Sequence, residues 1–205
     1  MKIVKSLLAL FLTLFVLSGI ANAQVLTTAV TGGKGNSALL ISPNGLFPDG
    51  LNLFNGYVQY SRGLTDRFDG YAAYGNITAL GQTQHYVGVG GNLNLVNSKA
   101  VCTPYDISWF NMVTVPVSRR TDASSVLWNS AIVVSFPIGP VTAYTGINGV
   151  IPIGDVAGGK LFTPGESLFN IPIGISKSVG RWTLFVEGDP GNNLKSFGVG
   201  ILRMF

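Results

Sequence analysis

Hydrophobic and polar positions alternate with a period of two along most of the chain. At its end, Val199 and Ile201 fall on one face of an extended segment, and Gly198 and Gly200 fall on the other. Successive side chains of a β-strand point to opposite faces, so this period indicates strands with one apolar face and one small or polar face. The pattern predicts an all-β fold of antiparallel strands.

The alternation recurs in separate segments, divided by turn-forming Gly, Pro, Asn and Asp residues. We expect about ten strands, with eight or twelve as alternatives. Pro43 and Asn44 are expected to bend or interrupt the first strand, and Pro172 to cause a bulge, because proline cannot donate to the ladder. The expected strands are residues 37–41, 53–61, 67–76, 84–97, 105–115, 126–136, 141–151, 167–177, 182–188 and 194–205.

The links between these segments alternate in length. Short links follow residues 61, 136 and 177, and longer links follow residues 76, 115, 151 and 188. Membrane barrels have short periplasmic turns and longer loops outside. The alternation therefore predicts a barrel whose C-terminal strand ends on the periplasmic side.

The beginning of the chain differs from the rest. Lys2 and Lys5 precede an apolar run over residues 7–17, and the segment ends in Ala21-Asn-Ala23. A short positive region, an apolar run too short to span a bilayer and an A-x-A ending are typical of a cleaved secretory signal peptide. We expect residues 1–23 to be this signal peptide, residues 24–35 a periplasmic lead-in or an extra strand, and residues 36–205 the barrel.

Composition favours a membrane barrel over a water-soluble sheet. Hydrophobic residues make up 47% of the chain and charged residues 11%, and there are 27 glycines. A soluble domain has about a quarter of its residues charged. In a membrane barrel the outer face is apolar, while the closed sheet pairs its backbone groups internally. We therefore expect an antiparallel transmembrane β-barrel.

Aromatic residues gather near the expected strand ends. Membrane barrels carry aromatic girdles at both lipid–water interfaces. The aromatic core of a soluble β-sandwich, or a secreted calycin-like binder with an apolar cavity and a polar outer face, remains the alternative. The residues concerned are Tyr57, Tyr60, Tyr74, Trp109, Phe136 and Trp182.

Two short motifs resemble those of bacterial outer-membrane β-barrel proteins. The last strand resembles their C-terminal signal, although Arg203 stands where the family usually has a further aromatic residue. The segment from Tyr60 to Gly70, with its Gly-Leu-Thr-Asp-Arg turn, resembles a hairpin of several such families. The resemblance implies the outer membrane of a Gram-negative bacterium, with membrane lipid, lipopolysaccharide and the barrel-assembly machinery as partners. Its assembly-signal residues would be Phe197, Val199, Ile201 and Phe205.

The charge distribution argues against nucleic acid as a partner. The formal charge of +4 reflects few acidic residues, and the basic residues are scattered over expected turns and loops. A nucleic-acid surface needs Lys and Arg clustered on one face with stacking aromatic residues. Arg119 and Arg120 either contact lipopolysaccharide phosphates or form a solvated pair on a loop.

We expect no catalytic, cofactor or metal site. The chain has one histidine, His85, and one cysteine, Cys102. It therefore cannot form an internal disulfide or the usual cluster of nitrogen and sulfur metal ligands. Gly88-Val-Gly-Gly91 precedes no expected helix, which a dinucleotide loop requires. His85 shares a face with Val89, and we interpret it as an interfacial polar residue rather than a catalytic base.

Charged residues on the inner face need partners, because an isolated charge in a low-dielectric wall is unfavourable. In a narrow barrel they would form a structural network, and in a wider one they would line a path for ions or small solutes. We therefore expect a structural or surface-interaction role, with a narrow channel and a soluble ligand binder as alternatives. The residues expected in this lumen network are Arg67, Asp69, Asp106, Arg181 and Glu187.

Overall fold

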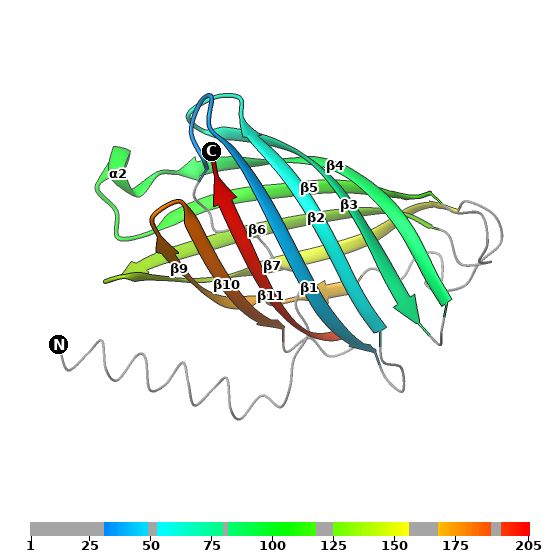
Figure 1. The fold of residues 1–205 in the computed structure, drawn as a ribbon. Helices are drawn as coiled ribbons and strands as arrows, with labels where there is room; N and C mark the ends of the chain where they lie inside the picture. The colour runs from blue at the N-terminus through cyan, green and yellow to red at the C-terminus, as the bar shows by residue number, and fades with distance from the viewer. Residues whose placement is uncertain (1–30, 49–52, 80–81, 118–124, 156–167, 190–193) are drawn as a thin grey trace.

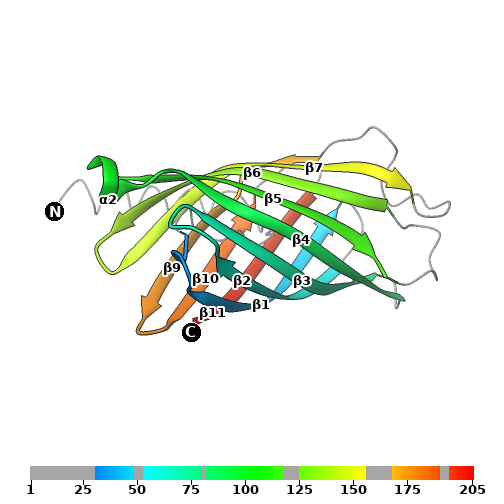
Figure 2. The ribbon, with the colours of Figure 1, turned by 90° about the horizontal axis from the view of Figure 1, so that it is seen from above.

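The structure is a computed structural model that describes residues 31–48, 53–79, 82–117, 125–155, 168–189 and 194–205. It contains one antiparallel sheet wrapped into a barrel (Figures 1 and 2). The expected signal peptide, residues 24–30 of the expected lead-in, and Arg119 and Arg120 lie outside the described residues.

The strands are tilted relative to the barrel axis, as the strands of closed barrels must be (Figure 1). No helix among the described residues is long and apolar enough to cross a membrane. In chain order the elements are β1 (Ser37–Pro48), β2 (Leu53–Gly63), β3 (Phe68–Ala79), β4 (Gln82–Val96), α2 (Ser98–Val101), β5 (Asp106–Pro116), β6 (Ser125–Ile138), β7 (Val141–Asp155), β8 (Leu168–Asn170), β9 (Ile173–Val179), β10 (Trp182–Asp189) and β11 (Leu194–Met204).

Strand pairing closes the barrel. The sheet has 11 strands, in which β1 pairs with β11 and β6 pairs with β7, so the described sheet has no open seam. β8 and β9 both pair with β7 and are two parts of one strand, interrupted at Ile171 and Pro172. Counting β8 and β9 together gives ten antiparallel strands, which confirms the predicted fold class and strand number.

The two faces of the sheet have the polarity that the alternation predicts. Large hydrophobic side chains point outward, and Val89, Ile147 and Phe169 are 65%, 64% and 68% exposed. Inward positions hold buried amides, hydroxyls and tyrosines, including Asn44 and Tyr144. A soluble ligand binder would have the reverse arrangement, so this structure does not fit that alternative.

The expected aromatic girdle residues point outward, with one exception. Tyr57 is buried inside the barrel, because it lies on the inward face of β2 together with Asn55 and Gln59. Its assignment to a girdle was wrong. The girdle residues that are exposed on the outer face are Tyr60, Tyr74, Trp109, Phe136 and Trp182.

β1 continues through the segment that was expected to interrupt it. Its pairing with β2 is continuous, and only the ladder to β11 skips Ser42 and Pro43. Pro43 has no N–H to offer the opposing carbonyl of Val199. Ser42 Oγ donates to this carbonyl oxygen at 2.8 Å instead. The side-chain hydrogen bond replaces the missing backbone bond, so the strand is not broken.

Pro172 interrupts the ladder without the expected bulge. The pairing of β7 with β8 and with β9 has the same register on both sides of the proline. The Pro172 carbonyl accepts from Gly146 N at 3.2 Å, and the reciprocal bond is lost because proline has no N–H. A shift of register lies elsewhere, between Asn94 and Val96 of β4.

The two ends of the barrel differ in their connections. The links after β2, β4, β6 and β9 lie at the same end as the C-terminal residue (left in Figure 1), which we call the C-terminal end. The strand ends that flank residues 118–124 and 156–167 lie at the opposite end. The loop expected after residue 76 is shorter than predicted, because β3 and β4 extend to residues 79 and 82. The links after β6 and β9 are short and those after β5 and β7 are longer, as predicted. The link after β4, residues 97–105, is long although it lies at the C-terminal end, and the link after β10, residues 190–193, is no longer than the link after β2, residues 64–67.

Candidate functional site: the barrel lumen

Apolar and aromatic side chains fill the middle of the lumen. Tyr71 of β3 stacks on Phe110 of β5, with ring centroids 5.4 Å apart. A barrel of this strand number is narrow enough for side chains to fill it. We call this cluster the lumen core; it comprises Leu40, Tyr57, Tyr71, Ala73, Phe110, Met112, Ala131, Val133, Tyr144 and Phe185.

Two inward glycines make room for lumen tyrosines. A Cβ on Gly75 would lie 2.5 Å from the ring of Tyr86, and a Cβ on Gly174 would meet the ring and hydroxyl of Tyr144. Tyr86 crosses the lumen face to donate to Asn55 Oδ1 at 2.8 Å. The interior is therefore packed by pairing the smallest residue on one strand with a large ring on its neighbour.

Three inward carboxylates accept hydrogen bonds from backbone N–H groups. Each donor residue lies outside the regular strands, where the ladder offers it no partner, and a buried N–H group must find an acceptor. These carboxylates thus fasten connecting segments to the barrel wall. The pairs are Asp69 Oδ2 with Gly32 N at 2.7 Å, Asp106 Oδ1 with Ser98 N at 2.8 Å, and Asp189 Oδ1 with Ile171 N at 3.2 Å.

Glu187 is the most deeply buried carboxylate of the lumen. Its side chain is 0% exposed, and its carboxylate interacts with the side chains of Tyr57 and Tyr144. The residues opposite it on the neighbouring strands are Gly174 and Gly198. Because neither glycine has a side chain, the carboxylate has room beside the tyrosines of the lumen core.

The structure separates charges that the sequence analysis grouped together. Asp69, Asp106 and Glu187 are buried on the inward face. Arg67 and Arg181 lie in the turns after β2 and β9, with exposed side chains. A guanidinium in a turn stays hydrated and avoids the free-energy cost of burying a charge. Among the side chains that the structure describes, the inward charged groups are acidic, so the lumen is negative.

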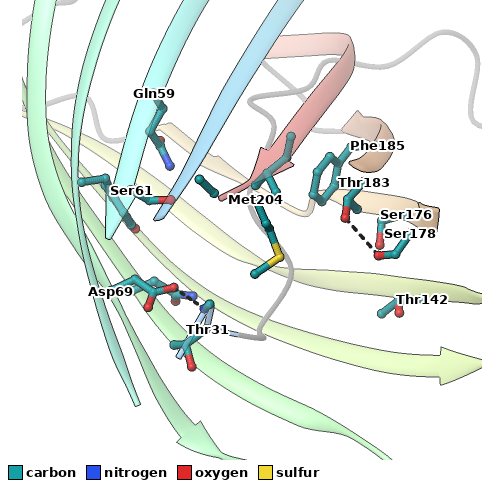
Figure 3. Close-up of a pocket in the computed structure, with 15 residues that line it drawn as sticks. Thr31, Gln59, Ser61, Asp69, Thr142, Ser176, Ser178, Thr183, Phe185 and Met204 are labelled. Atoms are coloured by element: carbon teal, nitrogen blue, oxygen red, sulfur yellow. Dashed lines mark hydrogen bonds between the residues drawn. The ribbon is translucent and has the colours of Figure 1, made fainter. Parts of the chain in front are cut away.

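A cavity of about 240 Å³ lies between the lumen core and the C-terminal end (Figure 3). Asp69 and Thr31 line one side, and on the other side Ser178 Oγ and Thr183 Oγ1 are 3.0 Å apart. Met204 projects between these two sides (Figure 3). The volume corresponds to about eight molecules of liquid water. The cavity can hold water or a small polar solute.

Residues 31–36 lie against the barrel end at this cavity. They are not a strand, but Gly35 N donates to Gly63 O at 2.8 Å and Gly63 N donates to Asn36 O at 2.9 Å. A Cβ on Gly63 would collide with the carbonyl of Gly33, so only glycine permits this close approach. The segment narrows the lumen at the C-terminal end.

The single histidine and single cysteine lie outside the lumen. His85 Nδ1 is 2.9 Å from the hydroxyl oxygen of Tyr74, and the two rings stack on the outer face. Cys102 is exposed and ends α2 with a left-handed φ of 52°. The glycine segment 88–91 lies within β4. Over the described residues, no group of three or more His, Cys, Asp or Glu side chains could hold a metal ion.

Asp189 and a set of lumen amides are further site residues that were not predicted from the sequence. Asp189 is two residues beyond Glu187 on the same face of β10, so the period of two could have placed it in the lumen. The amides are buried and have polar atoms without a hydrogen-bond partner in the part of the chain that the structure describes, and these atoms are available to lumen water or a solute. These atoms are Asn44 Nδ2, Asn92 Oδ1, Asn129 Oδ1, Asn148 Oδ1 and Asn170 Oδ1.

The residues of the expected assembly signal share the outer face of β11. Arg203 lies on the same face, with its guanidinium carbon 5.2 Å from the ring centroid of Trp182 and 5.1 Å from that of Phe205. The position where the resembling family has an aromatic residue is thus occupied by a cation between two rings. The signal residues, all exposed, are Phe197, Val199, Ile201 and Phe205.

No family model matches the chain, and no curated protein matches it. Among solved structures, the KdgM porin is 9% identical, with a TM-score of 0.45 over 82% of this chain and 99% of KdgM. The N-terminal β-barrel domain of Pseudomonas aeruginosa OprF is 11% identical, with a TM-score of 0.36 over 84% of this chain and 99% of that domain. Ail, the attachment invasion locus protein of Yersinia pestis, is 12% identical, with a TM-score of 0.27 over 84% and 99%. The barrel assignment rests on the strand pairing, and the neighbours' activities do not transfer.

Proposed function

We propose that this chain is a small outer-membrane β-barrel with a closed lumen and a structural or surface-interaction role. One observation carries the proposal: an apolar outer face surrounds an interior filled by the lumen core. A closed sheet of this polarity is stable where its outer face contacts lipid and its backbone groups are paired internally. The filled interior favours a structural role over transport.

We also propose how the chain reaches the outer membrane. Residues 1–23 would direct export and be removed, and the assembly signal ending in Phe205 would be read by the barrel-assembly machinery. The C-terminal end, which carries the short turns after β2, β6 and β9, would face the periplasm. The links 118–124 and 156–167 would then face outside, where lipopolysaccharide and surface partners are met.

Membrane insertion is tested by cell fractionation combined with heat-dependent migration on a gel. We expect the wild-type protein in the outer-membrane fraction, with a folded form that migrates faster until boiled. Deletion of Phe205 should abolish both properties, whereas Phe54→Ala, which changes an exposed outward aromatic residue of β2, should keep them. A wild-type product found soluble in the periplasm or medium would overturn the membrane proposal.

A narrow channel for cations is the second candidate function. It is favoured by the negative lumen, in which the inward charged side chains described are Asp69, Asp106, Glu187 and Asp189. The cavity of about 240 Å³ would form part of such a path. Acidic side chains in a pore favour cations over anions.

Bilayer conductance separates the two candidates. We expect no steady conductance from the purified wild-type barrel, because Tyr57 and Tyr144 help to close the lumen. Tyr57→Ala/Tyr144→Ala should conduct, with a preference for cations because the carboxylates remain. Phe54→Ala should stay closed. Steady wild-type conductance would overturn the closed-lumen role and establish the channel.

A further inference from the structure

Among the residues that the structure describes, seven basic side chains lie at the C-terminal end of the barrel. Lys195 lies near the opposite end, and Arg119, Arg120 and Lys160 are outside the described residues. The basic side chains at the C-terminal end are all exposed: Lys34, Arg62, Arg67, Lys99, Lys177, Arg181 and Arg203. This grouping was not visible in the sequence, because the residues come from separate strands and turns.

Some of these basic side chains point away from the lumen, on the outer side of the barrel wall. Arg62 of β2 and Ser37 of β1 are paired, Leu39 of β1 is paired with Arg203 of β11, and Arg203 is paired with Trp182 of β10. The cations thus lie on neighbouring strands of one stretch of wall. We call Arg62, Lys177, Arg181 and Arg203 the basic rim.

The acidic residues at this end do not neutralise the basic rim. Asp69 and Asp106 are buried on the inward face, where they accept from backbone N–H groups. Asp66 is exposed in the turn after β2, where its Oδ1 lies 3.4 Å from Lys34 N. The outer surface of the basic rim is therefore positive.

Exposed aromatic rings accompany the cations. Trp182 and Phe205 are 44% and 56% exposed, and both rings lie about the Arg203 guanidinium, at 5.2 and 5.1 Å. Rings in these positions hold the guanidinium by cation–π attraction and leave its N–H edges for an anion. Tyr60, whose hydroxyl oxygen is 2.9 Å from Ser37 Oγ, adds a third exposed ring nearby. Aromatic residues with Arg and Lys are the side chains that suit a lipid–water interface.

We propose that the basic rim binds the headgroup phosphate of an anionic glycerophospholipid, such as phosphatidylglycerol, at the periplasmic interface. The inference rests on the proposed membrane location. Arg203 presents a planar donor edge suited to phosphate oxygens. Lys177 is exposed on β9, where its pairing partner on β10 is the exposed Leu184, so its stem can cover apolar wall while its ammonium stays at the interface. Each cation near an anionic lipid surface favours binding by about fivefold.

Tryptophan quenching by brominated lipids tests this binding. A Trp109→Phe/Trp128→Phe protein keeps only Trp182, beside Arg203. We expect brominated phosphatidylglycerol to quench it more strongly than brominated phosphatidylcholine, with a relative binding constant of about threefold or more. Lys177→Gln/Arg181→Gln/Arg203→Gln in this background should reduce the ratio to about one. Arg67→Gln/Lys99→Gln removes two cations from the same end outside the basic rim and should keep the preference.

The same design separates failure of this inference from failure of the membrane proposal. A Trp109→Phe/Trp182→Phe protein keeps only Trp128, on the outer face near the start of β6. Quenching of Trp128 by brominated phosphatidylcholine reports insertion, whatever the headgroup preference. If neither tryptophan is quenched, the barrel is not in lipid. If both are quenched but Trp182 shows a ratio of one, or if the ratio survives the triple substitution, the lipid site is wrong.

Native mass spectrometry of the wild-type barrel provides a measurement without tryptophan substitutions. The barrel should retain phosphatidylglycerol in preference to phosphatidylethanolamine, and added inorganic phosphate should not displace it, because the acyl chains also contact the apolar wall. Equal retention of the two lipids, or displacement by free phosphate, would contradict the proposal.

Discussion

At the scale of single residues, the interior is built from complementary sizes. Tyr144 is buried, and its ring occupies the space that a side chain on Gly174 would need. Tyr86 stands over Gly75 in the same way. A lumen packed like this has little freedom to rearrange, because protein interiors are close-packed. Glycine is needed at these two positions because a side chain would collide with the tyrosine ring, and not because the backbone has an unusual conformation.

Gly174→Ala should destabilise the barrel by about 1–3 kcal/mol, because the new methyl group overlaps a buried ring that cannot move aside. The free energy of unfolding is measured by urea titration in lipid vesicles, with gel mobility reporting the folded fraction. Gly56→Ala is the matched control: its Cβ would lie 3.5 Å from the nearest side-chain atom. Tyr144→Leu in the Gly174→Ala background should restore part of the loss. Equal effects of the two alanines would contradict this packing.

At the scale of elements, β1 shows how a strand tolerates an internal proline. Pro43 points outward and leaves the carbonyl of Val199 without its backbone donor. The hydroxyl of Ser42 fills that role from the inward face, and its oxygen also lies 3.0 Å from Asn44 Oδ1. One side-chain hydrogen bond therefore bridges the gap in the ladder between β1 and β11.

Ser42→Ala should destabilise the barrel by about 1–3 kcal/mol, because the partly buried carbonyl of Val199 loses its donor. Pro43→Val in the same chain supplies a backbone N–H and should recover much of the loss. Ser108→Ala is the control, since the Ser108 hydroxyl is equally buried but has no hydrogen-bond partner in the described structure. The three proteins are compared by urea unfolding in vesicles. A loss that Pro43→Val does not recover would show that Ser42 acts through something other than the Val199 carbonyl.

Strand faces were predictable from the sequence, but strand ends and irregularities were not. The period of two assigns each residue to a face without knowledge of its pairing partner, so the faces of Val199, Gly200 and Glu187 were predicted correctly. The consequences of Pro43 and Pro172 depend on which carbonyl lies opposite and on what else can donate to it. That information comes from the register between strands, which a single sequence does not contain.

At the scale of the whole molecule, the lumen network was predicted only in part. Inward Asp69, Asp106 and Glu187 follow from alternation alone. Alternation would place Arg67 on the face of Asp69, and Arg181 on the face of Glu187, but both arginines lie in turns. Their side chains are hydrated there, and alternation no longer decides which residues are buried. The partners of the buried carboxylates were not predictable either, because Gly32 and Ser98 approach from segments without periodicity.

The orientation of the barrel can be tested with its own cysteine. Cys102 is exposed at the C-terminal end, which our proposal places in the periplasm. A membrane-impermeant maleimide should leave Cys102 unlabelled in intact cells and label it once the outer membrane is permeabilised. Cys102→Ser/Thr121→Cys moves the thiol to the link between β5 and β6, and should be labelled in intact cells, because consecutive antiparallel strands bring that link to the opposite end. The reverse pattern would show that the short turns face outward, and would move the basic rim to the outer leaflet.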